Sequence, residues 1–279
     1  MFRRAGILAA IVAGLLPATL ATPSRADAPR RVASLNLCAD QLLVMLLPPE
    51  RVASVTMLAA DPALSFVADR VEGMSVNHGG AEEILNGASD LVLASRHGRT
   101  ATAAILAASG LDVVEIDIPN DFDAIRAQVR RVAAALGAPA EAERLLRGMD
   151  DALRAANPPP GVRPPTALVW QASGFTAGAG TLVDAVLRAA GFENFAAKAG
   201  LVGYGYLSLE AVVTGRPDLL IAPAKAPDRP SLSDMLLLHP ALASLPRVEI
   251  PGALWSCGGP FTAEAVTRLA AHRRIMEGG

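Results

Sequence analysis

The chain contains two cysteines, Cys38 and Cys257, which lie 219 positions apart (257 − 38). In an oxidising compartment an even number of cysteines usually forms disulfides. A bond that closes so long a loop would stabilise the folded chain by about 4–5 kcal/mol in the chain-entropy model. The alternative is a pair of reduced thiols that face a ligand and touch a soft metal ion. We favour the disulfide.

The four histidines do not indicate a metal centre. A protein site for zinc needs several ligands that converge on one point. Only His78 and His97 fall in suitable loops, and both belong to the first half of the chain. We therefore expect no resident metal ion.

Motifs of the common enzyme classes are missing or incomplete. Gly178-Ala179-Gly180 resembles the start of a dinucleotide-binding loop, but Val183 stands where the third glycine is needed. The chain has no P-loop, no G-x-S-x-G elbow and no H-E-x-x-H motif. We expect a protein that binds a ligand and performs no catalysis. The formal net charge of −2, without a basic tract, also argues against nucleic acid as a partner.

The N-terminal segment has the pattern of a signal peptide. Arg3 and Arg4 precede an apolar run from Ala5 to Leu20, and Ser24-Arg25-Ala26 fits a cleavage site. We expect residues 1–26 to be removed and the rest to be soluble in the periplasm. The alternative is an uncleaved segment that tethers the protein.

A thirteen-residue pattern occurs twice. The segments 82–94 and 210–222 share five identical residues, including their leading glutamates and an aspartate, at an offset of 128 residues (210 − 82). One such unit in each half indicates two similar lobes with a cleft between them.

Apolar strand-like runs alternate with helical patterns, which predicts an α/β fold: two lobes with mostly parallel sheets joined by a long rigid helix. We place an N-terminal lobe at 27–138, the linking helix at 139–157 and a C-terminal lobe at 158–279. The expected strands are 31–35, 52–56, 90–94, 113–118, 167–171, 218–222 and 247–250, and the expected helices are 39–47, 81–85, 100–109, 121–136, 140–156, 181–190, 208–213, 233–238 and 262–276.

The linking helix shows one buried stripe, formed by Leu146, Met149, Leu153 and Ala156. On its outer face we expect two ion pairs at a spacing of four residues, Glu143 with Arg147 and Asp150 with Arg154.

With these features the chain resembles periplasmic substrate-binding proteins of the iron-siderophore and vitamin B12 uptake class. The resemblance rests on the order and spacing of 31–35, 82–94, 175–178, 191–194 and 210–222. It implies an ABC permease as partner, a single helix between the lobes and little lobe movement on binding.

In the resembled class, one surface glutamate on each lobe docks into the permease, and Glu82 and Glu210 occupy these positions. Exposed carboxylates would orient the encounter and still allow easy release. The alternative is that each glutamate only complements a helix N-terminus, with Ser208 as a cap for the second. Glu83 offers a neighbouring carboxylate in the first lobe.

The ligand should lie at the carboxyl ends of the parallel strands, where such sheets open into a crevice. Several of the chain's few aromatic residues fall there, as does a small group of cations, so we expect a large, flat or anionic metal chelate. Each residue alone could equally be an ordinary loop or core side chain. The ligand-binding candidates are Asn36, Asp40, Arg96, His97, Trp170, Phe175, Tyr204, Tyr206, Lys225 and Trp255.

We expect a monomeric carrier that captures a metal chelate and delivers it to the permease. A ferric siderophore is the first choice of ligand, because of Arg96, Arg99 and Lys225. Cobalamin is the second, because of Trp170 and Trp255, and haem is the third. A further alternative is an exported sensory or interaction module.

Overall fold

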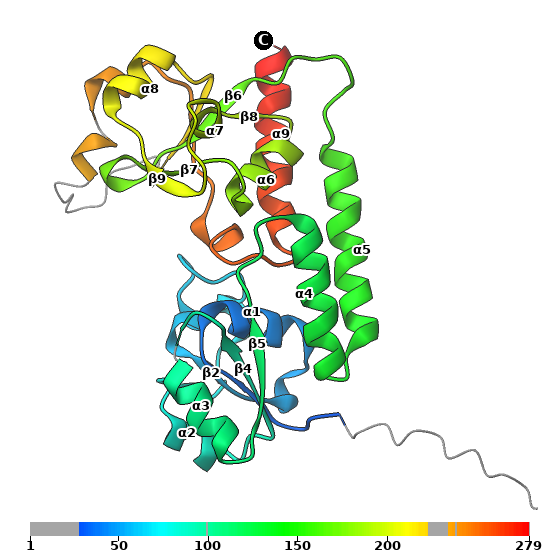
Figure 1. Cartoon of the computed structure of the whole chain (residues 1–279). Coiled ribbons are helices and arrows are strands. Elements are labelled where there is room, and N and C mark those ends of the chain that lie inside the picture. Colours follow the sequence, from blue (N-terminus) through cyan, green and yellow to red (C-terminus); the bar gives the residue numbers. More distant parts are fainter. Residues whose placement is uncertain (1–27, 99, 223–233, 238, 279) are drawn as a thin grey trace, which may run out of the picture.

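The computed structural model describes residues 28–98, 100–222, 234–237 and 239–278. Two lobes lie one above the other, and a column of long helices runs along one side of both (Figure 1). The predicted α/β class with two lobes of mostly parallel sheet is confirmed. The expected signal peptide, together with Arg99 and Lys225, lies outside the described residues.

The first lobe contains a five-stranded sheet in the order β3-β2-β1-β4-β5, with every pair parallel. Central strands β1 and β4 are buried almost throughout, which explains their continuous apolar sequence. The elements of this lobe are β1 (Val32–Ser34), α1 (Leu37–Leu46), η1 (Pro49–Arg51), β2 (Val52–Thr56), η2 (Met57–Ala60), η3 (Ala68–Arg70), β3 (Val76–Asn77), α2 (Ala81–Asn86), β4 (Leu91–Ser95), α3 (Thr100–Ala108), β5 (Asp112–Ile116) and α4 (Phe122–Ala135).

The second lobe contains a parallel four-stranded sheet, β11-β10-β6-β8, and a separate antiparallel ribbon formed by β7 and β9. Its elements are β6 (Thr166–Val169), η4 (Ala172–Gly174), β7 (Phe175–Ala177), α6 (Leu182–Ala189), β8 (Glu193–Asn194), α7 (Phe195–Lys198), β9 (Tyr204–Tyr206), α8 (Leu209–Gly215), β10 (Leu219–Ile221), η5 (Asp234–Leu236), η6 (Pro240–Leu242), β11 (Arg247–Val248), η7 (Gly252–Leu254) and α9 (Thr262–Gly278).

The two lobes are connected by α5 (Pro139–Ala156), which lies beside α4 and α9 (Figure 1). Its buried face contains Leu146, Met149 and Ala156, as the apolar spacing predicts, with Leu153 partly buried against the same core. No helix in the described part of the chain is long and apolar enough to cross a membrane.

The two ion pairs predicted within α5 are wrong. Glu143 pairs with Arg130 of α4 at 2.7 Å, and Asp150 pairs with Arg126 of α4 at 2.6 Å. These carboxylates face the neighbouring helix, so α4 supplies a better partner than the next turn of α5. The pairs therefore fasten the linking helix to the first lobe.

The lobes also contact each other directly. A disulfide joins Cys38 to Cys257, and Phe66 stacks on Phe261 with ring centroids 4.9 Å apart. The main hydrophobic cluster runs without a break through residues of both lobes. Because this core is shared, the lobes are held by packing and by a covalent bond as well as by α5.

The repeated pattern forms the same structure twice. Gly80 and Ser208 are the N-cap residues of α2 and α8, and both helices lead into a left-handed residue, Ala88 with φ 51° and Arg216 with φ 43°. Then Asp90 accepts hydrogen bonds from the backbone N–H groups of Arg30 and Arg31 (2.6 and 3.1 Å). Its counterpart Asp218 accepts one from the N–H of Thr166 (2.7 Å). Each aspartate thus ties the start of its strand to the neighbouring parallel strand.

Candidate ligand-binding cleft

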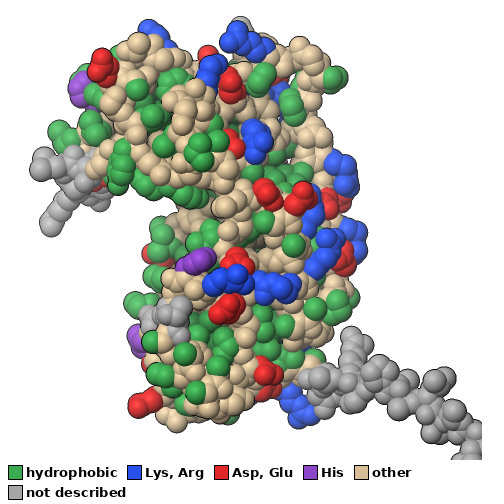
Figure 2. All heavy atoms as spheres, viewed as in Figure 1, with side chains coloured by type: hydrophobic (Ala, Val, Ile, Leu, Met, Phe, Trp, Pro, Cys, Tyr) green, Lys and Arg blue, Asp and Glu red, His purple; other side chains and the backbone are tan. Residues whose placement is uncertain are grey.

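The carboxyl ends of both parallel sheets meet at the space between the lobes. Cys38 follows β1 and Cys257 follows β11, so the disulfide that joins them shows that these two edges adjoin. Figure 2 shows a hollow between the lobes on the side opposite α5. Parallel sheets place their ligands at this edge, which makes the hollow the candidate site.

The wall formed by the second lobe is aromatic. Phe175 on β7 stacks on Tyr204 of β9 (centroids 6.1 Å apart) and meets the edge of Tyr206 (5.4 Å). Both tyrosines are well exposed, at 54% and 68%, and they are the only two in the chain. The part of the Tyr204 side chain that is covered is desolvated, which raises the pKa of its phenol above the ordinary value. The ribbon therefore presents a broad neutral aromatic face.

The wall formed by the first lobe is aliphatic, with one charged cluster. Met57 at the end of β2 is 63% exposed, and Ile118 beyond β5 is 54% exposed. Arg96 pairs with Glu115 at 3.4 Å and Asp117 at 3.2 Å, because its backbone N–H is hydrogen-bonded to Ile116 of β5. The guanidinium is thus neutralised within its own lobe.

Sequence reasoning did not single out Ile118 or the carboxylates around Arg96. The expected strand 113–118 is too long at its end, because β5 ends at Ile116 and Ile118 lies in the loop beyond it. The alternation of Glu115 and Asp117 is a signal that would have placed both side chains on one face of the strand.

Asp40 lies in the interior rather than in the cleft. Its side chain accepts hydrogen bonds from the Ser34 hydroxyl, the Thr56 N–H (2.9 Å) and the Thr56 hydroxyl (2.5 Å). Burial raises its pKa to about 6, although these hydrogen bonds act in the opposite direction. Asp40 therefore connects α1 to β1 and β2 and has no surface open to a ligand.

Asn36 has a structural role at the edge of the cleft. As the N-cap of α1 it accepts the N–H of Ala39 at 3.0 Å, while its side-chain nitrogen is buried without a partner. His97 is exposed at the turn after β4, where its backbone N–H is bonded to the Ser95 hydroxyl (3.2 Å).

Both tryptophans border a side cavity of the second lobe, of about 310 Å³. Trp170 is fully buried, and Trp255 is almost so. They are walls of this cavity and not exposed faces of the main cleft.

The two candidate docking glutamates are both exposed in the first turns of their helices, α2 and α8. These helices lie at opposite ends of the molecule, away from α5 (Figure 1). Neither Glu82 nor Glu210 has a hydrogen bond or ion pair with any residue that the structure describes.

Glu83 is occupied otherwise. Its carboxylate accepts the N–H groups of His78 (2.9 Å) and Gly80 (3.3 Å) and contacts the His78 ring nitrogen at 2.9 Å. The hydrogen bond with the His78 side chain is the main reason that the pKa of Glu83 lies below its usual range. Of the two neighbouring carboxylates, only Glu82 is left exposed without a partner among the described residues.

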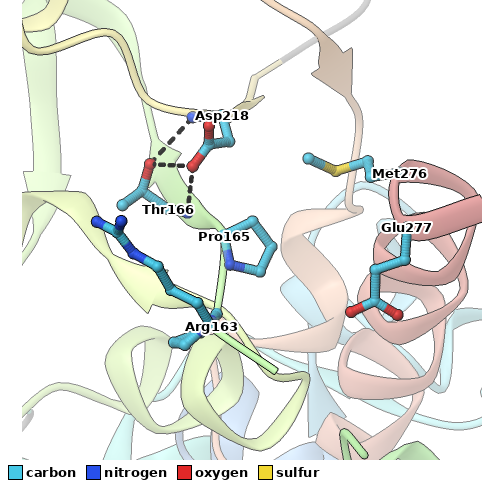
Figure 3. Close-up of a pocket in the computed structure, with 7 residues that line it drawn as sticks. Arg163, Pro165, Thr166, Asp218, Met276 and Glu277 are labelled. Carbon is cyan, nitrogen blue, oxygen red and sulfur yellow. Dashed lines mark hydrogen bonds between the residues drawn. The ribbon is translucent and has the colours of Figure 1, made fainter. Parts of the chain in front are cut away.

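Other cavities lie far from the cleft. One of about 420 Å³ occupies the amino edge of the sheet in the second lobe. In Figure 3, Thr166 and Asp218 are joined there by hydrogen bonds, with Arg163 on one side and Glu277 of α9 on the other. The aspartate in this cavity serves strand pairing. Within the described residues, no group of three or more His, Cys, Asp or Glu side chains could hold a metal ion.

Comparisons with known proteins agree with this architecture. A protein of Halobacterium salinarum named cobalamin-binding protein is 26% identical over 217 residues, which are 76% of this chain and 58% of that relative's length. The chain thus spans somewhat more than half of that curated relative.

Two solved structures share the fold. The apo form of the periplasmic haem-binding protein RhuT from Roseiflexus sp. RS-1 is 27% identical, with a TM-score of 0.69 over 87% of this chain and 97% of that one. The periplasmic haem-binding protein HutB of Vibrio cholerae is 18% identical, with a TM-score of 0.72 over 87% and 98% of the two chains, and shows the fold alone.

The family model described as periplasmic binding protein matches residues 32–249, well over half of the sequence. The chain therefore belongs to the periplasmic binding protein family, whose members are substrate-binding transport proteins and not enzymes.

Proposed function

We propose that this protein captures a planar metal macrocycle in the periplasm and delivers it to an ABC permease. A corrinoid is the first candidate for this ligand. The observation that carries the proposal is the exposed aromatic ribbon formed by Phe175, Tyr204 and Tyr206. Large contiguous aromatic faces are seldom left open in a soluble protein without a binding role. A flat macrocycle would cover this face and bury its apolar area.

The charges of the cleft favour a neutral macrocycle. Arg96 is balanced by Glu115 and Asp117, so the described rim of the first lobe offers no excess positive charge. A ferric siderophore or a haem with its carboxylates would need such charge. The siderophore that the sequence put first stays a prediction, resting on Arg99 and Lys225, which lie outside the described residues.

The comparisons support the same ligand class. One curated relative is named for cobalamin and one solved relative above 25% identity is named for haem. Haem is our second candidate, because Tyr204, Tyr206 and His97 present oxygen and nitrogen atoms of the kind that bind haem iron. The carboxylates of haem would find no excess positive charge on the described rim of the first lobe, which places the corrinoid ahead.

Delivery to a permease through Glu82 and Glu210 is part of the proposal. Two exposed carboxylates at the far ends of the two lobes could meet basic pockets of a membrane partner at once. Such contacts set orientation and encounter rate more than affinity. The carrier would act as a monomer, because one copy supplies both carboxylates.

The test is a binding titration of residues 27–279 with cyanocobalamin, haemin and a panel of ferric siderophores. Calorimetry should show one-to-one binding of cyanocobalamin, tighter than that of every other compound. Replacing Tyr204 and Tyr206 together by serine should weaken it about fivefold or more, because stacking on each ring contributes about 0.5–1.5 kcal/mol beyond area burial. Preferred binding of haemin would select the second candidate, and binding of a siderophore alone would overturn the macrocycle proposal.

A further inference from the structure

The helices α2 and α8 leave equivalent side chains exposed. Each helix buries one aliphatic residue in the core of its lobe, Ile84 in α2 and Val212 in α8. The aliphatic residue that follows is exposed instead: Leu85 at 41% and Val213 at 38%. These two residues are 128 positions apart (213 − 85), which is the offset of the repeated pattern. The two copies of the repeat therefore expose an aliphatic side chain at the same place.

Each of these aliphatic residues lies beside a docking glutamate. Residues three apart in a helix are neighbours on one face, with Cβ atoms about 5–6 Å apart, so Leu85 adjoins Glu82 and Val213 adjoins Glu210. The positive end of a helix dipole accounts for a glutamate in the first turn, but it gives no reason for an exposed aliphatic neighbour. A single exposed aliphatic residue is ordinary in a soluble protein, whereas its recurrence beside the same carboxylate in both lobes indicates a shared contact.

On the first lobe, α3 adds apolar surface at the same end of the molecule. This helix contacts α2 and includes no charged residue along Thr100–Ala108 (Figure 1). Ile105 is 54% exposed, and Ala101 and Ala108, which share its face of the helix, are exposed too. The docking end of the first lobe is therefore apolar over a wider area than one side chain.

These surfaces restrict the chemistry of the molecule that covers them. The carboxylates require basic groups opposite them, and the aliphatic side chains require an apolar surface next to those groups. Anionic lipid headgroups would repel the carboxylates, and a symmetric pair of copies of this chain would bring carboxylates against each other. A protein that offers basic pockets bordered by apolar surface fits both requirements.

We propose that each lobe docks on the permease through a pair of side chains, a carboxylate and its aliphatic neighbour. The pairs are Glu82 with Leu85 and Glu210 with Val213. The carboxylate speeds the encounter, and the aliphatic side chain slows dissociation because its apolar surface is buried in the complex. The inference rests on the proposed delivery to a permease and names the residues that hold the complex together.

The experiment measures the association and dissociation rates of the carrier on its permease, held in lipid nanodiscs, by surface plasmon resonance. Replacing Leu85 and Val213 together by serine should speed dissociation about tenfold and change association by less than about twofold. Replacing Glu82 and Glu210 together by glutamine should instead slow association and reduce its dependence on salt. This split between the two rates distinguishes the two members of each pair.

Three further variants sharpen the test. Leu85→Met keeps the apolar volume and should dissociate at nearly the wild-type rate. Ile105→Ser should speed dissociation, because it removes apolar surface from the docking end of the first lobe. Ile275→Ser is the matched control: this residue is 71% exposed on α9, which lies beside α5, and its replacement should alter neither rate. Thermal unfolding should show that all of these variants are folded, since every position is exposed.

Unchanged dissociation of the double serine variant, with association still slowed in the double glutamine variant, would overturn the aliphatic contacts and leave docking through the glutamates standing. Equal binding to nanodiscs without permease would assign these surfaces to lipid, and a wild-type dimer that the serine variant dissolves would assign them to a second copy. Either result would overturn the inference. No binding of the wild-type carrier to the permease would overturn the delivery function, and the inference with it.

Discussion

The two lobes are built alike but face the cleft differently. Each uses the same helix, left-handed turn, aspartate and strand, seen in Ala88 with Asp90 and in Arg216 with Asp218. At the cleft, however, the first lobe offers aliphatic side chains such as Met57, and the second offers an aromatic ribbon. Residues common to the lobes thus serve the backbone, while residues that differ form the candidate ligand site.

Even the glycine that the two repeats share is required for a different structural reason in each lobe. Gly87 ends α2, and a Cβ there would lie 3.3 Å from the carbonyl oxygen of Glu83. At Gly215 a Cβ would lie 2.4 Å from the ring of Phe195. The first glycine closes a helix, whereas the second makes room for a core side chain.

Cutting the covalent tie between the lobes should have the largest effect on stability. Replacing both Cys38 and Cys257 by alanine should lower the free energy of unfolding by about 5 kcal/mol in the chain-entropy model, because the bond closes a 219-residue separation. Urea denaturation measures this loss, and reduction of the wild-type protein should reproduce it. A loss below about 1 kcal/mol would show that contacts such as Phe66 on Phe261 hold the lobes without the bond.

The next effect concerns the buried carboxylate of the first lobe. The pKa of Asp40 rises from 3.8 to about 6 on folding, so the folded state binds this proton more tightly than the unfolded chain. The ionised carboxylate therefore destabilises the folded state at neutral pH. This destabilisation, up to about 3 kcal/mol for this group, is relieved as the pH falls from about 7 towards 4.

Urea denaturation between pH 7.5 and 4.5 should show this gain, and Asp40→Asn should remove it. A pH profile that is the same in wild type and Asp40→Asn would contradict the assignment.

The matched glycines allow a smaller and sharper comparison. Gly215→Ala should destabilise the protein by about 1–3 kcal/mol, because the added methyl group must displace the ring of Phe195. Gly87→Ala should change stability by less than about 1 kcal/mol, since the nearest atoms are at ordinary or slightly close distances. Thermal unfolding of both variants measures the difference, and equal losses would refute the contrast.

Charge reversal of the docking candidates should have the smallest effect on the folded protein. Glu82→Lys with Glu210→Lys should change stability by no more than about 0.5 kcal/mol and leave ligand affinity intact, since both side chains are exposed and unpaired among the described residues. Uptake into cells that carry the permease should nevertheless be lost. Each single variant should retain part of it.

Glu83→Gln is the control for this pair, because it disturbs the bonds to His78 and Gly80 without touching a docking carboxylate. Lost ligand affinity in the double variant would place Glu82 or Glu210 in the binding site. Unchanged uptake would remove them from docking.

Most of the regular fold could be predicted from the chain. The strands at 52–56 and 91–95 and the helix at 139–156 agree with expectation within a residue or two, since long apolar runs and helical spacing carry a strong signal. The ribbon strands β7 and β9 and the short β8 and α7 were not predicted as elements, because pieces of two to four residues have no measurable period.

Part of the candidate site was predictable from the positions at which the strands end. Phe175, Tyr204 and Tyr206 were named from their places after strands, and the structure brings their rings together. Asp40 and Trp170 followed the same rule but lie in the interior, and Arg96 was expected to face an anion but pairs with Glu115 and Asp117. Position after a strand does not tell which way a side chain points.

The sequence by itself therefore determined the two-lobed α/β plan, the repeat and the choice of cleft-side loops, because local periodicity and chain order are sufficient for these. Only the tertiary structure decided which side chains are exposed, which charges are neutralised and that Cys38 reaches Cys257. Those outcomes depend on burial and on partners that are distant in the chain, such as Arg130 for Glu143, and no local pattern encodes such partners.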